Sequence, residues 1–243
     1  MNSFARRLAS LAAMVATIIS AVSVAPQRSF DTLAVRADRF FNQKEWASAS
    51  ALYTLMIDQR PDSAALYGRA ITAAGMRNEV GEQQMLLRKA LQSKVPLDSL
   101  FNSVAHSSFA IGQSNLLERF LIMSAESEPW MSRKIDAQLL AYYTFRRNGE
   151  AMIEYASKLL KGAPDNENFG MRLAEGLLIE GRTDEAVSAF RNLLDHHPQS
   201  LDALLYLGEI ALEQSDTAMA RAYLERARAI CASPRLQTIL KSF

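Results

Sequence analysis

The feature that most constrains this chain is a repeat of 34 residues near its carboxyl end. Residues 167–200 and 201–234 can be written as two rows in register, and small or apolar residues recur in the same columns. Three of these columns hold Ala174 over Gly208, Ala186 over Ala220, and Phe190 over Leu224. A fixed period of this length predicts stacked helix pairs, because a single pair cannot bury its apolar faces alone.

The columns resemble those of the tetratricopeptide repeat family, whose period is also 34 residues. The second row carries Leu207 and Gly208 together, with Ala220 and Ala227 further on, and the first row closes with Pro198. The resemblance implies an all-α fold, a right-handed α-solenoid of antiparallel helix pairs, that binds proteins or peptides. The sequence also lacks the sustained period-two pattern that is typical of strands.

Several residues of these two rows have predicted structural roles. Gly208 is expected where the two helices of its unit cross, close to Ala220, because only a small side chain fits there. Gly181 is expected to end a helix in the left-handed conformation, which costs glycine little. Thr183 is then expected to cap the next helix, with acidic residues in its first turn, and Pro198 is expected to terminate it.

The repeat can be followed upstream with decreasing clarity toward the middle of the chain. Ile71 and Gln83 occupy columns where small residues are expected, so the two helices of that unit must splay or shift. The frame is least defined from 97 to 164, and the stack can break there into 30–96 and 131–243. The repeat domain is predicted over 30–234, with a capping helix at 235–243 and units at about 30–63, 64–96, 97–130, 131–164, 167–200 and 201–234.

The amino terminus has the layout of an export signal. Arg6 and Arg7 precede an uncharged run over residues 8–25, and small residues stand near the end of that run. Residues 1–25 are therefore predicted to direct export, which gives a periplasmic or secreted protein. The alternative is an uncleaved anchor that holds the repeats outside the cytoplasm, because a proline follows the run and its length is just enough to span a bilayer.

The balance of charges argues against a nucleic-acid partner. Lys and Arg total 27 against 26 Asp and Glu, whereas nucleic-acid-binding domains usually carry a basic face. Contact with a membrane is expected only through residues 8–25, if they stay uncleaved. The single cysteine, Cys231, has no partner for an intramolecular disulfide and is expected to be a small, partly buried apolar residue.

The sequence contains no catalytic, cofactor-binding or metal-binding motif. Glycine-rich phosphate loops and the GxSxG motif are absent. His196 and His197 are adjacent, so their side chains would point about 100° apart on a helix. They are interpreted as groups that cap the carboxyl end of a helix rather than as metal ligands. The chain is therefore predicted not to be an enzyme and to need no cofactor.

The resemblance also implies a partner-binding surface. In this family the first helices of successive units line a concave groove, and the matching columns of the last two units hold Met171, Arg172, Glu175, Leu205, Tyr206 and Glu209. Tyr206 offers the large rigid surface of an interface anchor. The alternative is that the apolar members of this face, with Leu178 and Leu212, pack on a neighbouring unit. The lysine and asparagine set with which some family members clamp a terminal carboxylate is missing.

These observations predict a non-catalytic scaffold that binds proteins or peptides in an exported compartment. One alternative is a membrane-anchored assembly factor of a cell-envelope complex, held by residues 8–25. Another is an enzyme subunit whose site lies in the degenerate middle repeats, where the residues of suitable chemistry are His106, Tyr142, Tyr143, Arg146 and Arg147.

Overall fold

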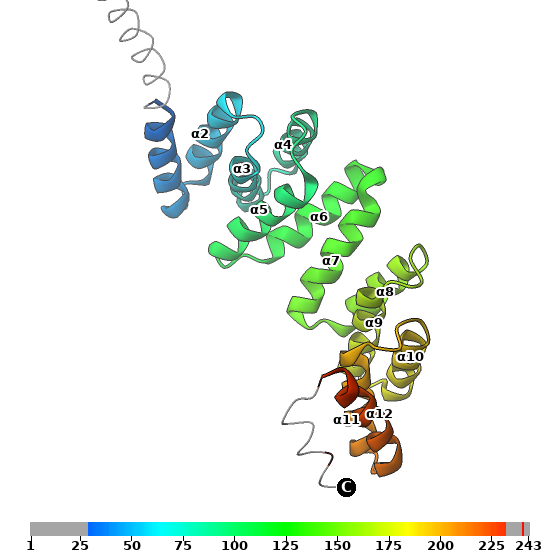
Figure 1. Ribbon diagram of the computed structural model, residues 1–243. Helices are drawn as coiled ribbons and strands as arrows, with labels where there is room; N and C mark the ends of the chain where they lie inside the picture. The colour runs from blue at the N-terminus through cyan, green and yellow to red at the C-terminus, as the bar shows by residue number, and fades with distance from the viewer. Residues whose placement is uncertain (1–28, 232–239, 241–243) are drawn as a thin grey trace, which may run out of the picture. The chain divides into compact units, whose positions relative to one another are not determined.

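The computed structural model describes residues 29–231 and residue 240, and these divide into two compact units, the first of which ends at Ser127. Every regular element among the described residues is a helix (Figure 1), so the all-α prediction is confirmed. The expected export signal at 1–25 lies outside the described residues. The expected capping helix at 235–243 also lies outside them, except for Leu240, which is helical and buried.

The amino-terminal unit is built from pairs of helices joined by short turns. The first helix covers residues 29–42. The helices that follow are α2 (Trp46–Gln59), α3 (Ala64–Met76), α4 (Val80–Gln92), α5 (Leu97–Ala110) and α6 (Asn115–Ser127). Helix α3 packs against α2, α4 and α5, and α6 packs against both α4 and α5. Each pair therefore lies against the next, as expected for a stack of repeats.

The carboxyl-terminal unit opens with a single 3₁₀ turn, η1 (Pro129–Met131), and then continues with helix pairs. These helices are α7 (Ser132–Arg146), α8 (Gly149–Leu160), α9 (Glu167–Ile179), α10 (Thr183–His196), α11 (Leu201–Glu213) and α12 (Thr217–Ile230). Each packs against its neighbour in sequence, and α7 also contacts α9. Across the described part of the chain, each range predicted for a repeat unit contains one pair of helices.

Glycines allow two helix crossings to bring backbones close together. In the amino-terminal unit, a Cβ atom on Gly68 of α3 would lie 2.6 Å from the carbonyl carbon of Ser103 in α5. In the carboxyl-terminal unit, a Cβ atom on Gly176 of α9 would lie 3.0 Å from the carbonyl oxygen of Gly149 in α8. A side chain at either position would have to push a backbone aside, so these glycines set how closely the helices approach.

The turn between α9 and α10 confirms one local prediction and corrects another. Gly181 has a φ angle of +71°, in the left-handed region, and follows Glu180, the residue that caps the carboxyl end of α9. The capping position of α10 is Arg182 rather than Thr183, and Arg182 makes no side-chain capping bond. The N–H of Arg182 donates to the carbonyl of Leu177 across the turn at 2.8 Å, and its own carbonyl accepts from Ala186 at 3.0 Å. The glycine turn thus starts α10 one residue earlier than the sequence suggested.

Two further sequence predictions need correction. The atoms nearest to a Cβ on Gly208 would be Leu224 Cδ2 at 2.7 Å and Leu224 Cγ at 2.8 Å, so the glycine makes room for Leu224 and not for Ala220. Leu224 lies one turn further along α12 than Ala220, and its side chain fills the space beside the glycine. Cys231, expected to be partly buried, is exposed at the end of α12.

The two large residues in the unit formed by α3 and α4 are held by a hydrogen bond. Gln83 is 5% exposed, and its side-chain amide donates to the backbone carbonyl of Ile71 at 3.1 Å. A Cβ atom on Gly75 would lie 2.8 Å from the same amide nitrogen. Gly75 therefore supplies the space that Gln83 needs, and the buried amide keeps a partner, without which its burial would be costly.

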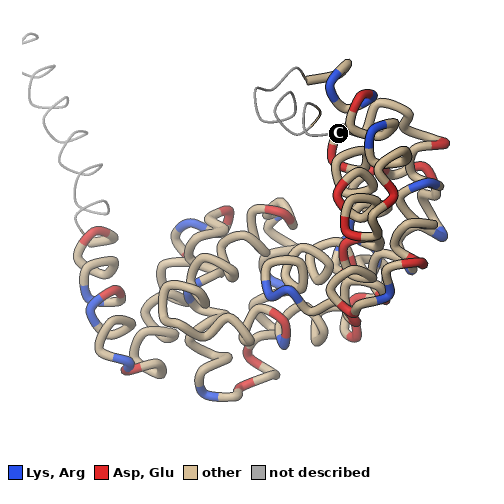
Figure 2. The backbone as a smooth tube through the Cα atoms, turned by 90° about the horizontal axis from the view of Figure 1, so that it is seen from below, with Lys and Arg blue, Asp and Glu red and all other residues tan. Residues whose placement is uncertain are grey.

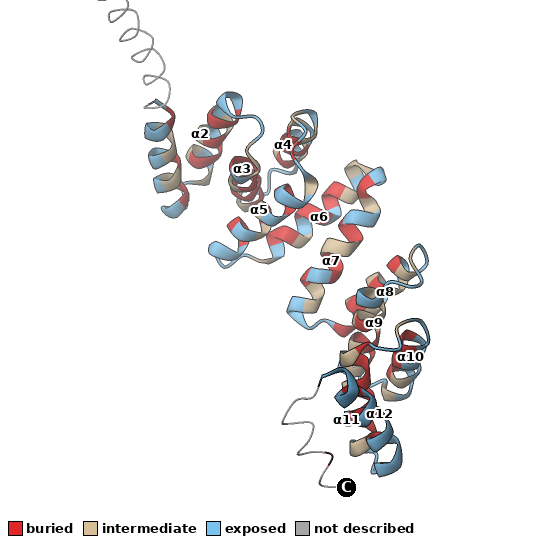
Figure 3. Ribbon diagram, in the orientation of Figure 1, coloured by how far each residue is buried: buried red, intermediate tan, exposed pale blue. Residues whose placement is uncertain are grey.

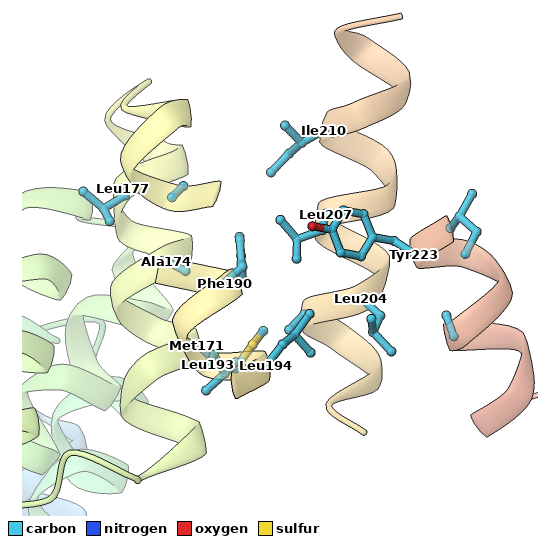
Figure 4. Close-up of a cluster of buried hydrophobic side chains, with 14 of the residues drawn as sticks. Met171, Ala174, Leu177, Phe190, Leu193, Leu194, Leu204, Leu207, Ile210 and Tyr223 are labelled. Carbon is cyan, nitrogen blue, oxygen red and sulfur yellow. The ribbon is translucent and has the colours of Figure 1, made fainter. Parts of the chain in front are cut away.

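Small and apolar side chains of α9 to α12 form the core of the carboxyl-terminal unit. Buried residues follow the inward faces of these helices (Figure 3), and their side chains meet between the helices (Figure 4). Phe190 is fully buried at the centre, which contributes about 2–3 kcal/mol relative to an exposed ring. The same cluster includes Ala174, Leu207, Leu224, Ala227 and Leu240. The residues that defined the repeat columns are thus mostly core residues.

Candidate functional site

Three adjoining hollows on the carboxyl-terminal unit form a groove lined by α7, α9 and α11. The apolar hollow, of about 340 Å³, includes Arg147, Met152, Leu178, Ile179 and Tyr206. The middle hollow, of about 330 Å³, includes Ala137, Leu140, Ala141, Thr144 and Phe169. The acidic hollow, of about 430 Å³, includes Asn166, Glu167, Asn168, Met171 and Asp202. Arg172 lines all three, so it stands at the centre of the groove.

Helical spacing explains why the polar residues of the groove share one wall. Asn168, Arg172 and Glu175 follow each other on α9 at intervals of four and three residues, which places them on one face of the helix. Asp202 and Tyr206 are four residues apart on α11 and stand on one face in the same way. The first helices of three successive repeat units therefore present their side chains to a common surface.

The side chains of Arg172, Glu175 and Tyr206 form a connected network. Arg172 Nη1 lies 2.5 Å from Glu175 Oε2, and Arg172 Nε donates to Asn168 Oδ1 at 3.4 Å. The hydroxyl of Tyr206 donates to Glu175 Oε1 at 3.4 Å and so links α11 to α9. Glu175 is thus shared between a cation and a phenol, and the charge of Arg172 is largely compensated inside the groove.

Tyr206 is fixed against the core as well as open to the groove. Its ring stacks on that of Phe190, with centroids 5.1 Å apart and planes 14° from parallel. Burial raises the pKa of Tyr206, and the negative charges of Glu175 and Asp202 raise it further, while Arg172 lowers it. The phenol therefore stays protonated and can donate a hydrogen bond at neutral pH.

The other residues expected on this surface have different positions. Met171 is only 7% exposed and belongs to the core, although its side chain borders the acidic hollow. Leu205 is partly buried against the core, as are Leu178 and Leu212. Glu209 is exposed, one turn beyond Tyr206. Leu178, Leu205 and Leu212 therefore pack against the core, which was the alternative considered for the apolar side chains. Leu178 also lines the groove.

Sequence comparison did not identify some of the residues that line the groove. Arg147 and Thr144 come from the end of α7, where the repeat columns were least defined. Ile179 is the last residue of α9, and it is 37% exposed although it is a large apolar side chain. The signal that the sequence offers at this position is an isoleucine two residues before the glycine of a turn.

His196 and His197 lie at the carboxyl end of α10, as expected, and outside the groove. Nδ1 of His196 lies 3.0 Å from the carbonyl oxygen of Asn192, and Nε2 of His197 lies 2.7 Å from that of Asp165. A carbonyl can only accept, so each of these ring nitrogens carries a proton. The pair borders a separate hollow of about 380 Å³, and within the described residues no three metal-binding side chains cluster.

The residues considered for an enzymatic site are divided between the two compact units. His106 is exposed on α5 of the amino-terminal unit, whereas the two tyrosines and two arginines belong to α7 and the turn that follows it. Tyr143 stacks on Tyr155 with ring centroids 5.6 Å apart, and Tyr142 packs edge-on against Tyr143 at 5.2 Å. The tyrosines therefore contribute to packing between α7 and α8.

Charges of both signs are interspersed along the described backbone (Figure 2). Blue Lys and Arg positions and red Asp and Glu positions occur in both compact units. Among the described helices, none is both long and apolar enough to cross a lipid bilayer.

Comparison with known proteins finds a family model that matches part of the last two repeat units. Residues 171–233 match the tetratricopeptide repeat, which supports the resemblance drawn from the columns. The chain is also 26% identical over 204 residues to cellulose synthase operon protein C of Escherichia coli O157:H7. That match covers 81% of this chain but only 17% of the relative, so the chain corresponds to a small part of it.

Solved structures with the same fold include two helical-repeat proteins. One is the C-terminal part of a TPR repeat-containing protein from Cytophaga hutchinsonii, with a TM-score of 0.50, 16% identity, and coverage of 81% of this chain and 78% of that one. The other is MamA, from residue 41 to its end, from Desulfovibrio magneticus RS-1, with a TM-score of 0.51, 12% identity, and coverage of 70% and 96%. At these identities the likeness establishes the fold alone.

Proposed function

We propose that this chain is a non-catalytic scaffold whose carboxyl-terminal groove binds a segment of a partner protein. The observation that carries the proposal is the groove itself, where Ile179 and Tyr206 remain accessible beside a fixed polar network. Large apolar side chains are normally buried, and those left exposed in a concave surface are typical of binding sites. The polar network supplies hydrogen-bond donors and acceptors in fixed positions, which favours specific recognition over non-specific hydrophobic binding.

The binding surface that we propose comprises Arg172, Glu175, Leu205, Tyr206 and Glu209, extended by Ile179 and Arg147 from the ends of α9 and α7. We leave out Met171, because its side chain is already buried in the core. Tyr206 would be the central anchor, since a ring already stacked on Phe190 loses little conformational freedom when a partner covers it.

A matched pair of variants tests this function. Ile179 ends α9 within the groove, and Ile230 ends α12 away from it, with exposures of 37% and 42%. The full chain is immobilised, and the proteins that it captures from an extract of its own cells are quantified by mass spectrometry. We expect Ile179→Ser to reduce capture of a specific partner about fivefold, which corresponds to about 1 kcal/mol of lost apolar burial. Ile230→Ser should retain it.

Two outcomes of that experiment would contradict the proposal. One is equal capture of every protein by both variants, which would place binding elsewhere on the chain. The other is that the wild-type chain captures no protein that depends on Ile179. Circular dichroism of both variants serves as the control for folding. Both should stay folded, because both isoleucines lie at helix ends and neither is fully buried.

We further propose that this scaffold works outside the cytoplasm. The support is the charged start and apolar run of residues 1–25 in the sequence. Residues 1–30 fused to a reporter that is active only after export should give signal, and the mature protein should begin near residues 22–26. Full-length protein in the soluble cytoplasm would contradict export.

A second candidate is a membrane-anchored assembly factor of a cell-envelope complex. It is favoured by the length of the run at residues 8–25 and by the name of the E. coli relative, a cellulose synthase operon protein. Full-length protein recovered with the membrane fraction would favour this candidate over a cleaved, soluble scaffold. The groove would have the same binding role in either case.

A further inference from the structure

We propose that the groove recognises a basic segment, in which a Lys or Arg side chain enters the acidic hollow while a neighbouring apolar side chain enters the apolar hollow. This inference rests on the function proposed above, and it adds the chemistry of the partner.

The acidic hollow has more negative charge than its single cation can compensate. Its charged lining consists of Glu167, Glu175 and Asp202 against Arg172 alone. Arg172 is already paired with Glu175 at 2.5 Å, so its charge is committed within the network. Among the described residues, the ring of His197 is the group near Glu167, with Nδ1 4.0 Å from Oε2, beyond hydrogen-bond distance. Within the described part of the chain, the carboxylates of Glu167 and Asp202 are therefore open to a cation that enters from outside.

The floor of the acidic hollow suits a long aliphatic stem. Met171 forms part of the lining, and its side chain continues into the core. Methionine is flexible and polarisable, so it adapts to whatever packs on it. Lys and Arg place their methylene groups on apolar surface and keep the charged head among polar groups. The head would then lie near the carboxylates of Glu167 and Asp202, and the Asn166 and Asn168 side chains add polar lining.

The apolar hollow lies on the other side of Arg172 and carries the opposite charge balance. Its lining has Arg147 and Arg172 against Glu175, so a cationic side chain is disfavoured there. Met152, Leu178 and Ile179 give it an apolar wall. The acidic hollow favours a cationic side chain and the apolar hollow disfavours one. The two hollows would therefore fix the register of a bound segment, with the basic group over α9 and α11 and the apolar group toward α7 and α8.

Tyr206 lines the apolar hollow, and its hydroxyl donates to Glu175, which lines both the apolar and the acidic hollow. Beyond the effect of burial, Glu175 and Asp202 raise the pKa of its hydroxyl, and Arg172 alone opposes them. Two carboxylates therefore act on this hydroxyl against one cation, and that cation, Arg172, is already paired with Glu175.

Helix ends provide a simpler reason for acidic residues at these positions, and the chain offers a control for it. Glu167 and Asp202 lie in the first turns of α9 and α11, where carboxylates are favoured by the helix dipole. Asp184 and Glu185 occupy the first turn of α10 in the same way, but they line none of the three hollows. If dipole stabilisation were their only role, both pairs would be equivalent toward a ligand.

The experiment compares these two pairs with charged peptides as probes. The probes are two fluorescein-labelled peptides of about a dozen residues, with alternating leucine and alanine positions in common and with either lysines or glutamates at the charged positions. Binding to the full chain is followed by fluorescence anisotropy at low and at physiological salt. The variants are Glu167→Gln/Asp202→Asn and, as control, Asp184→Asn/Glu185→Gln, which remove the same charge.

We expect the lysine peptide to bind the wild-type chain at least tenfold more tightly than the glutamate peptide. The Glu167→Gln/Asp202→Asn variant should lose about tenfold of this affinity, since two partly screened charge contacts together are worth about one decade. The control variant should keep the wild-type affinity. The difference between the two variants should shrink as salt rises, because exposed charges are screened.

Equal affinity for the two peptides, or an equal loss in the two variants, would overturn the inference. Preference for the glutamate peptide would overturn it as well. If the peptide results fail while Ile179→Ser still reduces capture of a cellular partner, the groove keeps its proposed function and only the basic character of the ligand is rejected. If Ile179→Ser has no effect on capture, the groove itself is rejected.

Discussion

Replacing Gly68 by alanine should destabilise the amino-terminal unit far more than the loss of a glycine normally would. The new Cβ atom would lie 2.6 Å from both the carbonyl carbon and the Cβ of Ser103, and 2.7 Å from its carbonyl oxygen. Ordinary contacts of this kind begin near 3.4 Å. Since the obstructing atoms include backbone, the strain can be relieved only if α3 and α5 move apart.

The expected magnitude follows from two opposing effects. Overpacking of this severity costs about 3 kcal/mol, at the upper end of the usual range, because a helix and not a side chain must shift. The higher helix propensity of alanine stabilises a helix interior by about 1 kcal/mol relative to glycine. Gly68→Ala should therefore lose about 2 kcal/mol. Gly81→Ala is the matched control, because no atom lies within 4 Å of its Cβ position in α4, and it should gain up to about 1 kcal/mol.

Urea unfolding followed by far-ultraviolet circular dichroism measures both variants. Repeat pairs contact mainly their neighbours, so the two compact units need not unfold together, and the comparison should use the transition that the Gly68 variant shifts. We expect the midpoint to fall for Gly68→Ala and to stay or rise for Gly81→Ala. A Gly68→Ala protein as stable as wild type would refute the close crossing of α3 and α5.

Three other changes test the packing and capping of the carboxyl-terminal unit by the same unfolding assay. Gly208→Leu should cost about 3 kcal/mol, because its Cβ would already lie 2.7 Å from a core side chain, and an unchanged midpoint would contradict that packing. Asn148→Ala should cost about 1 kcal/mol, since the Asn148 side chain accepts a bond from the first turn of α8; no loss would mean that water replaces the cap equally well. Tyr206→Ala should lower stability by about 2 kcal/mol through its stack on Phe190, and an unaffected protein would place the ring outside the core.

The periodic part of the fold could be predicted because it depends on burial that recurs every 34 residues. Ala174, Phe190, Leu207 and Leu224 are buried as their columns required, since each repeat must cover its neighbour. The left-handed turn at Gly181 was also predictable, because few other residues adopt that conformation without strain.

Contacts between helices were less accessible to sequence reasoning. A column comparison shows that Gly208 is small, but it cannot show which residue of α12 lies opposite, and the structure gives Leu224. Gly68 lies outside the repeat's small-residue columns, so its role at the crossing with α5 left no periodic signal. Thr183 looked like a cap by composition, but the hydrogen bonds of the preceding glycine turn determined where α10 begins.

The candidate groove was predicted in part. Arg172, Glu175 and Tyr206 were expected on one surface because the resemblance to the tetratricopeptide repeat family implies it for their columns. Arg147 was not expected to join them, because it follows α7 in a left-handed conformation that the sequence did not indicate. The sequence also could not show which charged side chains pair with each other. The structure shows that Arg172 pairs with Glu175, and the proposal of a basic ligand depends on this pair.

Site-specific photo-cross-linking tests most directly whether the groove is the binding surface. A photoreactive amino acid is placed at Asn168, an exposed residue that lines both the middle and the acidic hollow, or at Asn192, an exposed residue that lines the hollow beside His196 instead. After irradiation in cells, we expect a covalent adduct with the partner protein from position 168 and none from position 192. Adducts only from position 192, or equally from both, would contradict binding in the groove.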